Sequence, residues 1–199
     1  MITNLRKYLT NLSLAAAVAF LFAPSAASAI TITGANRSFE INPATTGTSG
    51  ASLNPGAGDV GAFFGGTWTS AGERTSAGTD NFFTVNLLAG SFGSGDASGT
   101  WSIAPSFWST YGSAVISVHV GQGQGDPDYW MFGIPANTLS GTWAYDIFSG
   151  GGGGLSNIKL WGSGTPRPPV TQGVPDGGFT LALLGLGLGL VVIARRKLC

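Results

Sequence analysis

The chain has 199 residues, of which 33 are glycine and only 9% are charged, and its formal net charge is zero. The charges are unevenly placed, because five of the nine basic residues lie within the first seven and the last five positions. Residues 30–178 therefore carry a formal charge of 4 − 9 = −5, which excludes the basic patch of a nucleic-acid-binding protein. The single cysteine is Cys199, so no disulfide can form within the chain.

The N-terminal segment has the three parts of a secretory signal peptide. A basic pair at residues 6–7 precedes an apolar run over residues 12–22, and Ala27 and Ala29 then occupy the small-residue positions of a cleavage site. The apolar run is too short to be a good membrane span. Residues 1–29 are therefore predicted to direct export through the Sec machinery, and signal peptidase is expected to cut after Ala29.

Residues 30–161 are predicted to form one all-β outer domain. Glycine, threonine, serine and aromatic residues are frequent there, lysine and glutamate are scarce, and no window has the pattern of a long amphipathic helix. Short runs separated by turn-forming residues favour an antiparallel β-sandwich or jelly roll. The predicted strands are residues 30–34, 61–69, 82–89, 99–104, 113–120, 129–134, 141–148 and 155–161.

A Gly-Thr-Trp sequence occurs three times, at residues 66–68, 99–101 and 141–143. The spacings of 33 and 42 residues are unequal, so the tripeptide is not the repeat of a solenoid. It is typical instead of a strand start, in which glycine ends a turn and tryptophan begins the inward face. Alternation then places Trp101 and Trp143 in the core.

Two further segments lack strand character. Residues 43–59 are rich in threonine, serine, glycine and proline and are predicted to form a long loop. Residues 162–173 contain three prolines and are predicted to form an extended linker that separates the outer domain from the C-terminal residues.

The outer domain has few residues suited to catalysis, and no cofactor or metal is expected. His119 is the only histidine, it is predicted to face solvent, and no G-x-S-x-G sequence is present for a hydrolytic triad. The close acidic pair Asp126 and Asp128 follows a glycine-rich run, which indicates a hairpin turn. A weak calcium loop at this pair is the alternative.

Aromatic side chains offer a second kind of site, a platform on which sugar rings stack. Trp161 shares a strand face with the polar residues Asn157 and Lys159, and Trp108 and Tyr111 lie in a segment that is typical of a loop. These three aromatic residues are therefore predicted to be accessible, and they are the ligand candidates of the sequence.

The last 26 residues have three parts in a fixed order. Val174, Pro175, Asp176, Gly177 and Gly178 form a short turn-forming run. Sixteen uncharged residues follow, and as a helix they would span roughly 24 Å, so anchoring residues must reach both interfaces. A basic cluster then ends the span, and it is expected to stay on the cytoplasmic side. Its residues are Arg195, Arg196 and Lys197.

This order of motif, apolar helix and basic cluster resembles the PEP-CTERM class of sorting tails, in its VPDSG-type variant. The chain differs from that variant at Gly177, which stands where the pattern has serine. The resemblance implies recognition by an exosortase, a membrane-embedded cysteine protease or transpeptidase, that cuts near the motif and releases or re-anchors the exported part. A plain C-terminal membrane anchor is the alternative.

Taken together, the sequence predicts an exported surface or matrix protein without catalytic activity, associated with exopolysaccharide or the cell envelope. The precursor is expected in the inner membrane, and the processed protein at the cell surface or outside the cell. A surface-displayed carbohydrate-binding module is the first alternative. A small glycoside hydrolase is the second, and it requires two carboxylates that face each other across a cleft.

Overall fold

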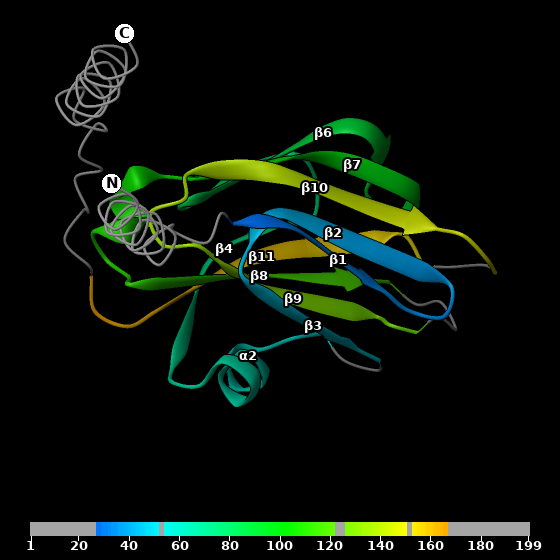
Figure 1. Ribbon diagram of the computed structural model, residues 1–199. Helices are drawn as coiled ribbons and strands as arrows, with labels where there is room; N and C mark the ends of the chain where they lie inside the picture. Colours follow the sequence, from blue (N-terminus) through cyan, green and yellow to red (C-terminus); the bar gives the residue numbers. More distant parts are fainter. Residues whose placement is uncertain (1–26, 52–53, 122–125, 151–152, 167–199) are drawn as a thin grey trace, which may run out of the picture.

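The computed structural model describes residues 27–51, 54–121, 126–150 and 153–166, which form a sandwich of two antiparallel sheets (Figure 1). Sheet A contains six strands in the order β1 (Ser28–Thr33), β2 (Arg37–Ala44), β10 (Ser140–Ile147), β7 (Ser94–Ile103), β6 (Phe83–Ser91) and β5 (Gly78–Asp80). Sheet B contains five, in the order β3 (Thr46–Gly50), β9 (Tyr129–Ile134), β8 (Ser113–Val120), β11 (Leu155–Ser163) and β4 (Trp68–Arg74).

Every neighbouring pair of strands in the two sheets is antiparallel, so the all-β sandwich predicted from composition is confirmed. The chain passes from sheet A to sheet B directly between β2 and β3. Thr45 fixes this crossing, because its backbone N–H and its hydroxyl both donate to the Gly133 carbonyl of β9, at 2.9 and 3.1 Å. The two sheets therefore share one continuous segment at this end of the sandwich.

The predicted strands at residues 113–120 and 129–134 match β8 and β9 at both ends. The predicted loop at residues 43–59 is wrong, because β2 continues to Ala44 and β3 occupies Thr46–Gly50. β3 is an edge strand of threonine, serine and glycine that pairs with β9 through its backbone, so it lacks the apolar alternation that marks a strand in sequence. The prediction also missed the whole of β2, which begins at Arg37, and the short β5. β7 begins at Ser94, five residues before the predicted start, so the tripeptide at 99–101 lies inside a strand and does not begin one.

The predicted strand at residues 61–69 is wrong in its first half. Helix α2 (Ala57–Phe64) occupies this part, β4 begins at Trp68, and a second short helix, α3 (Pro105–Trp108), follows β7. A helix forms because the Asp59 carboxylate accepts a hydrogen bond from the Gly56 backbone N–H at 2.8 Å, and Asp59 lies at the third position of the helix. The helix is too short to show a clear period in the sequence.

The predicted targeting segments lie largely outside the described residues. β1 begins at Ser28, and its pairing with β2 becomes regular only from Ile30 onward, which is the residue after the predicted signal-peptidase site. At the other end β11 continues to Ser163, two residues past the predicted end of the last strand. The linker from residue 167 and the whole sorting tail lie outside the described residues. In the part of the chain that the structure describes, no helix is long and apolar enough to cross a membrane.

Two of the Gly-Thr-Trp tripeptides face each other at the centre of sheet A. β7 and β10 pair so that Thr100 lies opposite Thr142, and each tryptophan lies opposite the glycine of the other tripeptide. The indole N–H of Trp101 donates to the Thr142 carbonyl at 3.2 Å, and that of Trp143 donates to the Thr100 carbonyl at 3.3 Å. The pair is therefore reciprocal, and both tryptophans are buried as predicted.

Glycine is required on both sides of this reciprocal pair. A Cβ atom added at Gly141 would lie 2.6 Å from the Trp101 ring, and one added at Gly99 would lie 2.9 Å from the Trp143 ring. Both added atoms would also overlap a backbone carbonyl of the adjacent strand. The two indole rings therefore lie flat over bare backbone, and Trp143 stacks on Phe39 of β2 with 6.0 Å between ring centroids.

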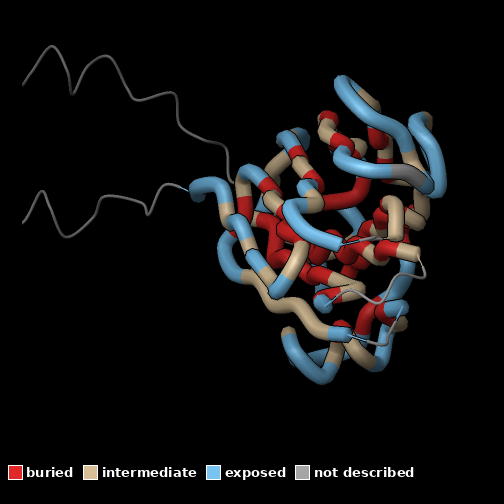
Figure 2. The backbone as a smooth tube through the Cα atoms, turned by 90° about the vertical axis from the view of Figure 1, so that its right-hand side faces the viewer, coloured by how far each residue is buried: buried red, intermediate tan, exposed pale blue. Residues whose placement is uncertain are grey.

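The predicted accessibility of Trp108 and Trp161 is wrong, since only 6% and 5% of their surfaces are exposed. Trp161 does lie on the outer face of β11, opposite the core residues Ile158 and Leu160, so its predicted face is correct. That outer face is covered, because α2 lies against the outside of sheet B (Figure 1). Figure 2 shows the buried chain concentrated between the exposed outer segments.

The reciprocal pair predicts a stability effect for Gly141→Ala. The added methyl group must displace the Trp101 ring or the adjacent backbone, so we expect a loss of about 1–3 kcal/mol in the free energy of unfolding. Urea denaturation of the full chain measures it. The control is Gly58→Ala in α2, where an added Cβ meets nothing within 4 Å and alanine should stabilise the helix by about 0.5–1 kcal/mol. Equal effects at the two positions would contradict the close approach.

The covered outer face of sheet B predicts that Trp161→Ala is as damaging as Trp143→Ala. Both changes remove a buried indole ring and leave a cavity, so we expect each to cost about 3–5 kcal/mol in unfolding free energy. Phe148→Ala is the control, because this side chain is 54% exposed and its loss should change little. A Trp161→Ala protein that melts in urea together with the Phe148→Ala protein would show that α2 does not cover this ring.

Candidate functional site

The outer face of sheet B carries a second, smaller apolar cluster beneath α2. Its buried members come from the helix, from the following strand and from three further strands of the sheet, and Phe64 and Tyr129 pack against them. The indole N–H of Trp161 donates to the Ser117 hydroxyl at 2.7 Å, which satisfies the one polar group of this ring. The buried members are Val60, Trp68, Val115, Met131 and Trp161.

Trp68 joins α2 to the sheet. The helix ends at Gly65, where a positive φ of 74° turns the chain, and the Trp68 indole N–H donates to the Gly65 carbonyl at 2.7 Å. The Phe64 and Trp68 rings meet edge to face with 6.0 Å between their centroids. These contacts hold the helix over the sheet and leave a hollow on each of its sides.

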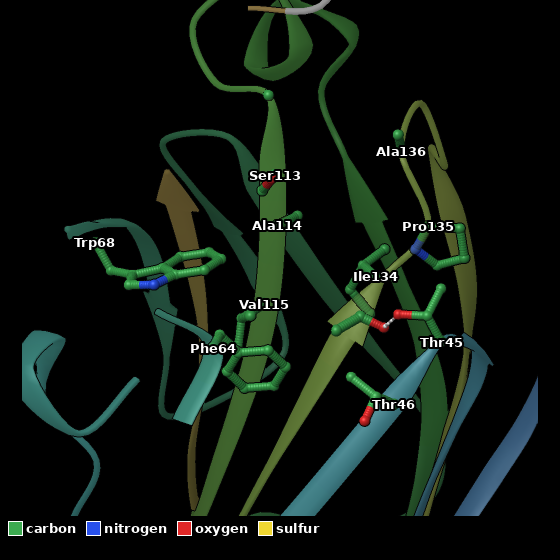
Figure 3. A pocket seen from close by; sticks show the side chains of 12 residues that line it. Thr45, Thr46, Phe64, Trp68, Ser113, Ala114, Val115, Ile134, Pro135 and Ala136 are labelled. Carbon is green, nitrogen blue, oxygen red and sulfur yellow. Dashed lines mark hydrogen bonds between the residues drawn. The ribbon is translucent and has the colours of Figure 1, made fainter. Parts of the chain in front are cut away.

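The first hollow is a pocket of about 270 Å³, here named the Trp68 pocket (Figure 3). In Figure 3 the Phe64 and Trp68 rings form one side, strand β8 from Ser113 to Val115 lies behind them, and Ile134 and Pro135 are on the opposite side. Gly133 leaves the space open, because an added Cβ would lie 3.3 Å from the Phe64 ring and 2.9 Å from the Thr45 hydroxyl. The pocket thus combines two aromatic rings with hydroxyl groups.

The second hollow has a volume of about 260 Å³ and is named the Phe63 groove. Phe63 is 48% exposed, which is unusual for a large apolar side chain of this domain. Met131 and the Tyr129 ring belong to the adjoining sheet, and Thr48 and Asp59 supply the polar groups. Exposed aromatic surface beside hydroxyl and carboxylate oxygens is a combination that sugars or apolar side chains can bind.

The three ligand candidates of the sequence do not form a site. Trp108 packs edge to face against Phe107, and its indole N–H donates to the Thr138 carbonyl at 3.0 Å. Tyr111 lies against the bare backbone of Gly162, where an added Cβ would come within 2.5 Å of its ring. With Trp161 under α2, neither indole ring offers an open face, and Tyr111 alone of the three is partly exposed. A partial signal for the two hollows is present in the sequence, since Trp68 belongs to the first Gly-Thr-Trp tripeptide, but α2 was not predicted.

His119 lies on the outer face of β8, on the same side as Ser117. Burial lowers the pKa of His119, the carboxylate of Asp128 opposes that shift, and Lys159 adds to it. Asp126 is exposed, and the backbone N–H of Asp128 donates to the Gly50 carbonyl at 2.8 Å. Within the described residues, no three histidine, cysteine or acidic side chains are grouped as metal ligands. The predicted hairpin between β8 and β9 includes residues 122–125, which lie outside the described part.

A buried polar group lies at the end of sheet A, away from both hollows. Arg37 is fully buried at the start of β2, and its Nε atom donates to the Asn36 side-chain oxygen at 3.2 Å. The Tyr145 hydroxyl donates to the Gly153 carbonyl at 2.7 Å. Burial raises the pKa of Tyr145, and the nearby Arg37 guanidinium opposes that shift. This tyrosine therefore stays neutral at physiological pH and acts as a hydrogen-bond donor that ties a loop to the core.

Comparison with known proteins finds one relationship. The family model of the VPDSG-CTERM motif matches residues 173–198, a range that includes the predicted motif at 174–178 and the basic cluster at 195–197. Neither the curated proteins nor the solved structures gave a match to this chain. A tail of this type implies an exported protein that is processed by an exosortase and sorted to the cell surface. The protein thus carries, at residues 173–198, a PEP-CTERM-type sorting tail of the VPDSG kind.

Proposed function

We propose that this protein is a non-catalytic component of the cell surface or of the extracellular polysaccharide matrix, delivered there by an exosortase. The observation that carries the proposal is the sorting tail at residues 173–198 joined to a β-sandwich domain. Such a tail directs the attached outer domain to the cell surface. The role of the protein there then depends on what the outer domain binds. The predicted signal peptide at residues 1–29 agrees with this route.

The composition of the two hollows supports a role in binding rather than catalysis. Hydrolysis of a glycosidic bond requires two carboxyl groups on opposite sides of the sugar, about 5–10 Å apart. Asp59 is the one acidic side chain that lines either hollow, and its carboxylate already accepts the hydrogen bond that begins α2. His119 lines neither of them. A third hollow, of about 240 Å³ over β7 and β10, is lined by both Asp96 and Asp146, but the Asp96 carboxylate already accepts a hydrogen bond from the Ile147 backbone N–H at 2.7 Å. A glycoside hydrolase would have to use that pair, and it is the weakest of the three candidate functions.

Carbohydrate binding is the second candidate function, and the Phe63 groove is the observation that favours it. Its two aromatic side chains, Phe63 and Tyr129, can pack against sugar rings, while the Thr48 hydroxyl and the Asp59 carboxylate can bind sugar hydroxyls. This site replaces the platform of Trp108, Tyr111 and Trp161 that the sequence predicted. A displayed domain of this kind would attach the protein to exopolysaccharide.

The sorting proposal predicts that the motif is required in addition to the hydrophobic tail. In a Pro175→Ala/Asp176→Ala variant the apolar span and the basic cluster are unchanged, so the variant should still be exported and inserted in the membrane. We expect it to accumulate as uncut precursor in the inner membrane of the native host, measured by cell fractionation and intact mass. A double variant Pro168→Ala/Thr171→Ala in the linker is the control and should be processed. Normal cutting and export of the motif variant would show that the tail is not a sorting signal of this class.

The carbohydrate proposal predicts that Phe63→Ala weakens binding to the exopolysaccharide of the native host. Loss of one stacking ring should lower the affinity by roughly tenfold, if it contributes about 1.4 kcal/mol. Affinity electrophoresis in gels containing the polysaccharide measures this as loss of retardation. Phe148→Ala removes an equally exposed ring elsewhere and should leave the mobility shift unchanged. Equal retardation of both variants, or of neither, would exclude the Phe63 groove as the sugar site.

A further inference from the structure

We propose that the Trp68 pocket binds the proline-rich segment that immediately follows the outer domain, residues 166–169. The domain would then be held against the start of its own linker. This inference concerns a different hollow from the Phe63 groove and does not depend on what the protein binds at the cell surface.

The first argument is the place where the chain leaves the fold. Ser163, the last residue of β11, pairs with Ser113 of β8 on one side and with Trp68 of β4 on the other. Both of these neighbours line the Trp68 pocket. The Ser163 hydroxyl also donates to the Thr67 carbonyl at 2.6 Å, and its own carbonyl accepts from the Gly112 N–H at 3.0 Å. β11 therefore ends at the rim of the pocket, three residues before Pro166. Residues 164–166 are exposed and do not line the pocket in this structure, so docking requires this short segment to turn toward it.

The second argument is the chemistry of the emerging segment. Pro166-Arg167-Pro168-Pro169 has the P-x-x-P spacing. In a polyproline II helix, with three residues per turn, that spacing places Pro166 and Pro169 on the same side, roughly 9 Å apart. Segments of this kind bind grooves lined by aromatic rings, because the proline rings pack on them at little cost in conformational entropy.

The pocket has the matching features. The Phe64 and Trp68 rings supply the aromatic side, and Ile134 and Pro135 supply an apolar side opposite to them (Figure 3). A polyproline II backbone makes no internal hydrogen bonds, so its carbonyls need external donors. The hydroxyls of Thr46 and Ser113 line the same pocket and can donate to them. The aromatic and hydroxyl groups thus suit a proline-rich backbone better than they suit a charged ligand.

The tether makes even a weak interaction sufficient. A short linker gives the tethered segment an effective concentration of about the millimolar range, so docking does not require high intrinsic affinity. Docking through Pro169 would leave four residues, 170–173, before the sorting motif. Fully extended, four residues reach at most roughly 14 Å. The linker would then hold the domain close to the motif during sorting. It would not act as the extended linker that the sequence predicts for residues 162–173.

Disulfide trapping in the purified full-length precursor, in detergent and with Cys199→Ser, tests this proposal. The first variant adds Ala136→Cys at the Trp68 pocket and Val170→Cys in the linker. The matched control pairs Val170→Cys with Ala62→Cys, which is also exposed but lines the Phe63 groove. In a redox buffer, we expect the intramolecular disulfide of the first pair to form at least about tenfold faster. Replacing Pro166 and Pro169 by alanine should remove this advantage, while Pro168→Ala should preserve it.

Equal rates for the two pairs, or a fast rate that survives the Pro166→Ala/Pro169→Ala change, would overturn the proposal. Disulfides that form only between two molecules would also overturn it and would identify a second copy of the chain as the occupant of the pocket. The experiment uses purified protein without an exosortase. Its failure is therefore distinguishable from a failure of the sorting proposal, which is measured by processing in the host.

Discussion

The fold depends on the reciprocal contact between two Gly-Thr-Trp tripeptides in neighbouring strands of sheet A. Each indole ring lies over the glycine of the other strand and donates its N–H to a backbone carbonyl of that strand. The arrangement fixes the register of β7 against β10, because a shift by one residue would place each ring over a side chain and move it to the other face. The stacked Phe39 ring then extends this packing to β2.

Sheet B differs from sheet A in that apolar side chains lie on both of its faces. Its inner face packs on sheet A, and its outer face is covered over only part of its area by a helix of eight residues. A short helix cannot cover five strands, so hollows remain on both of its sides, each with an aromatic residue of α2 in its wall. The helix that completes the core is therefore also the element that creates the candidate binding surfaces.

The described part of the chain ends at the same end of the sandwich as the Trp68 pocket. β11 ends at Ser163 beside the Trp68 pocket, and the segment leading to the motif begins three residues later. At the opposite end of the sandwich, the Tyr145 hydroxyl ties a loop to the core beside the buried Arg37.

The sequence by itself determined the destination of the protein, the all-β class, the limits of β8 and β9 and the burial of Trp101 and Trp143. These features depend on the order of motifs along the chain or on the strict alternation of apolar and polar residues in a strand, and both patterns are visible in the sequence. Only the tertiary structure decided the existence of β3 and α2 and the burial of Trp161. β3 is held by backbone hydrogen bonds to β9 rather than by apolar side chains. Trp161 lies on the face that alternation predicts, yet it is buried because a helix from a distant part of the chain covers it, and no local pattern records that contact.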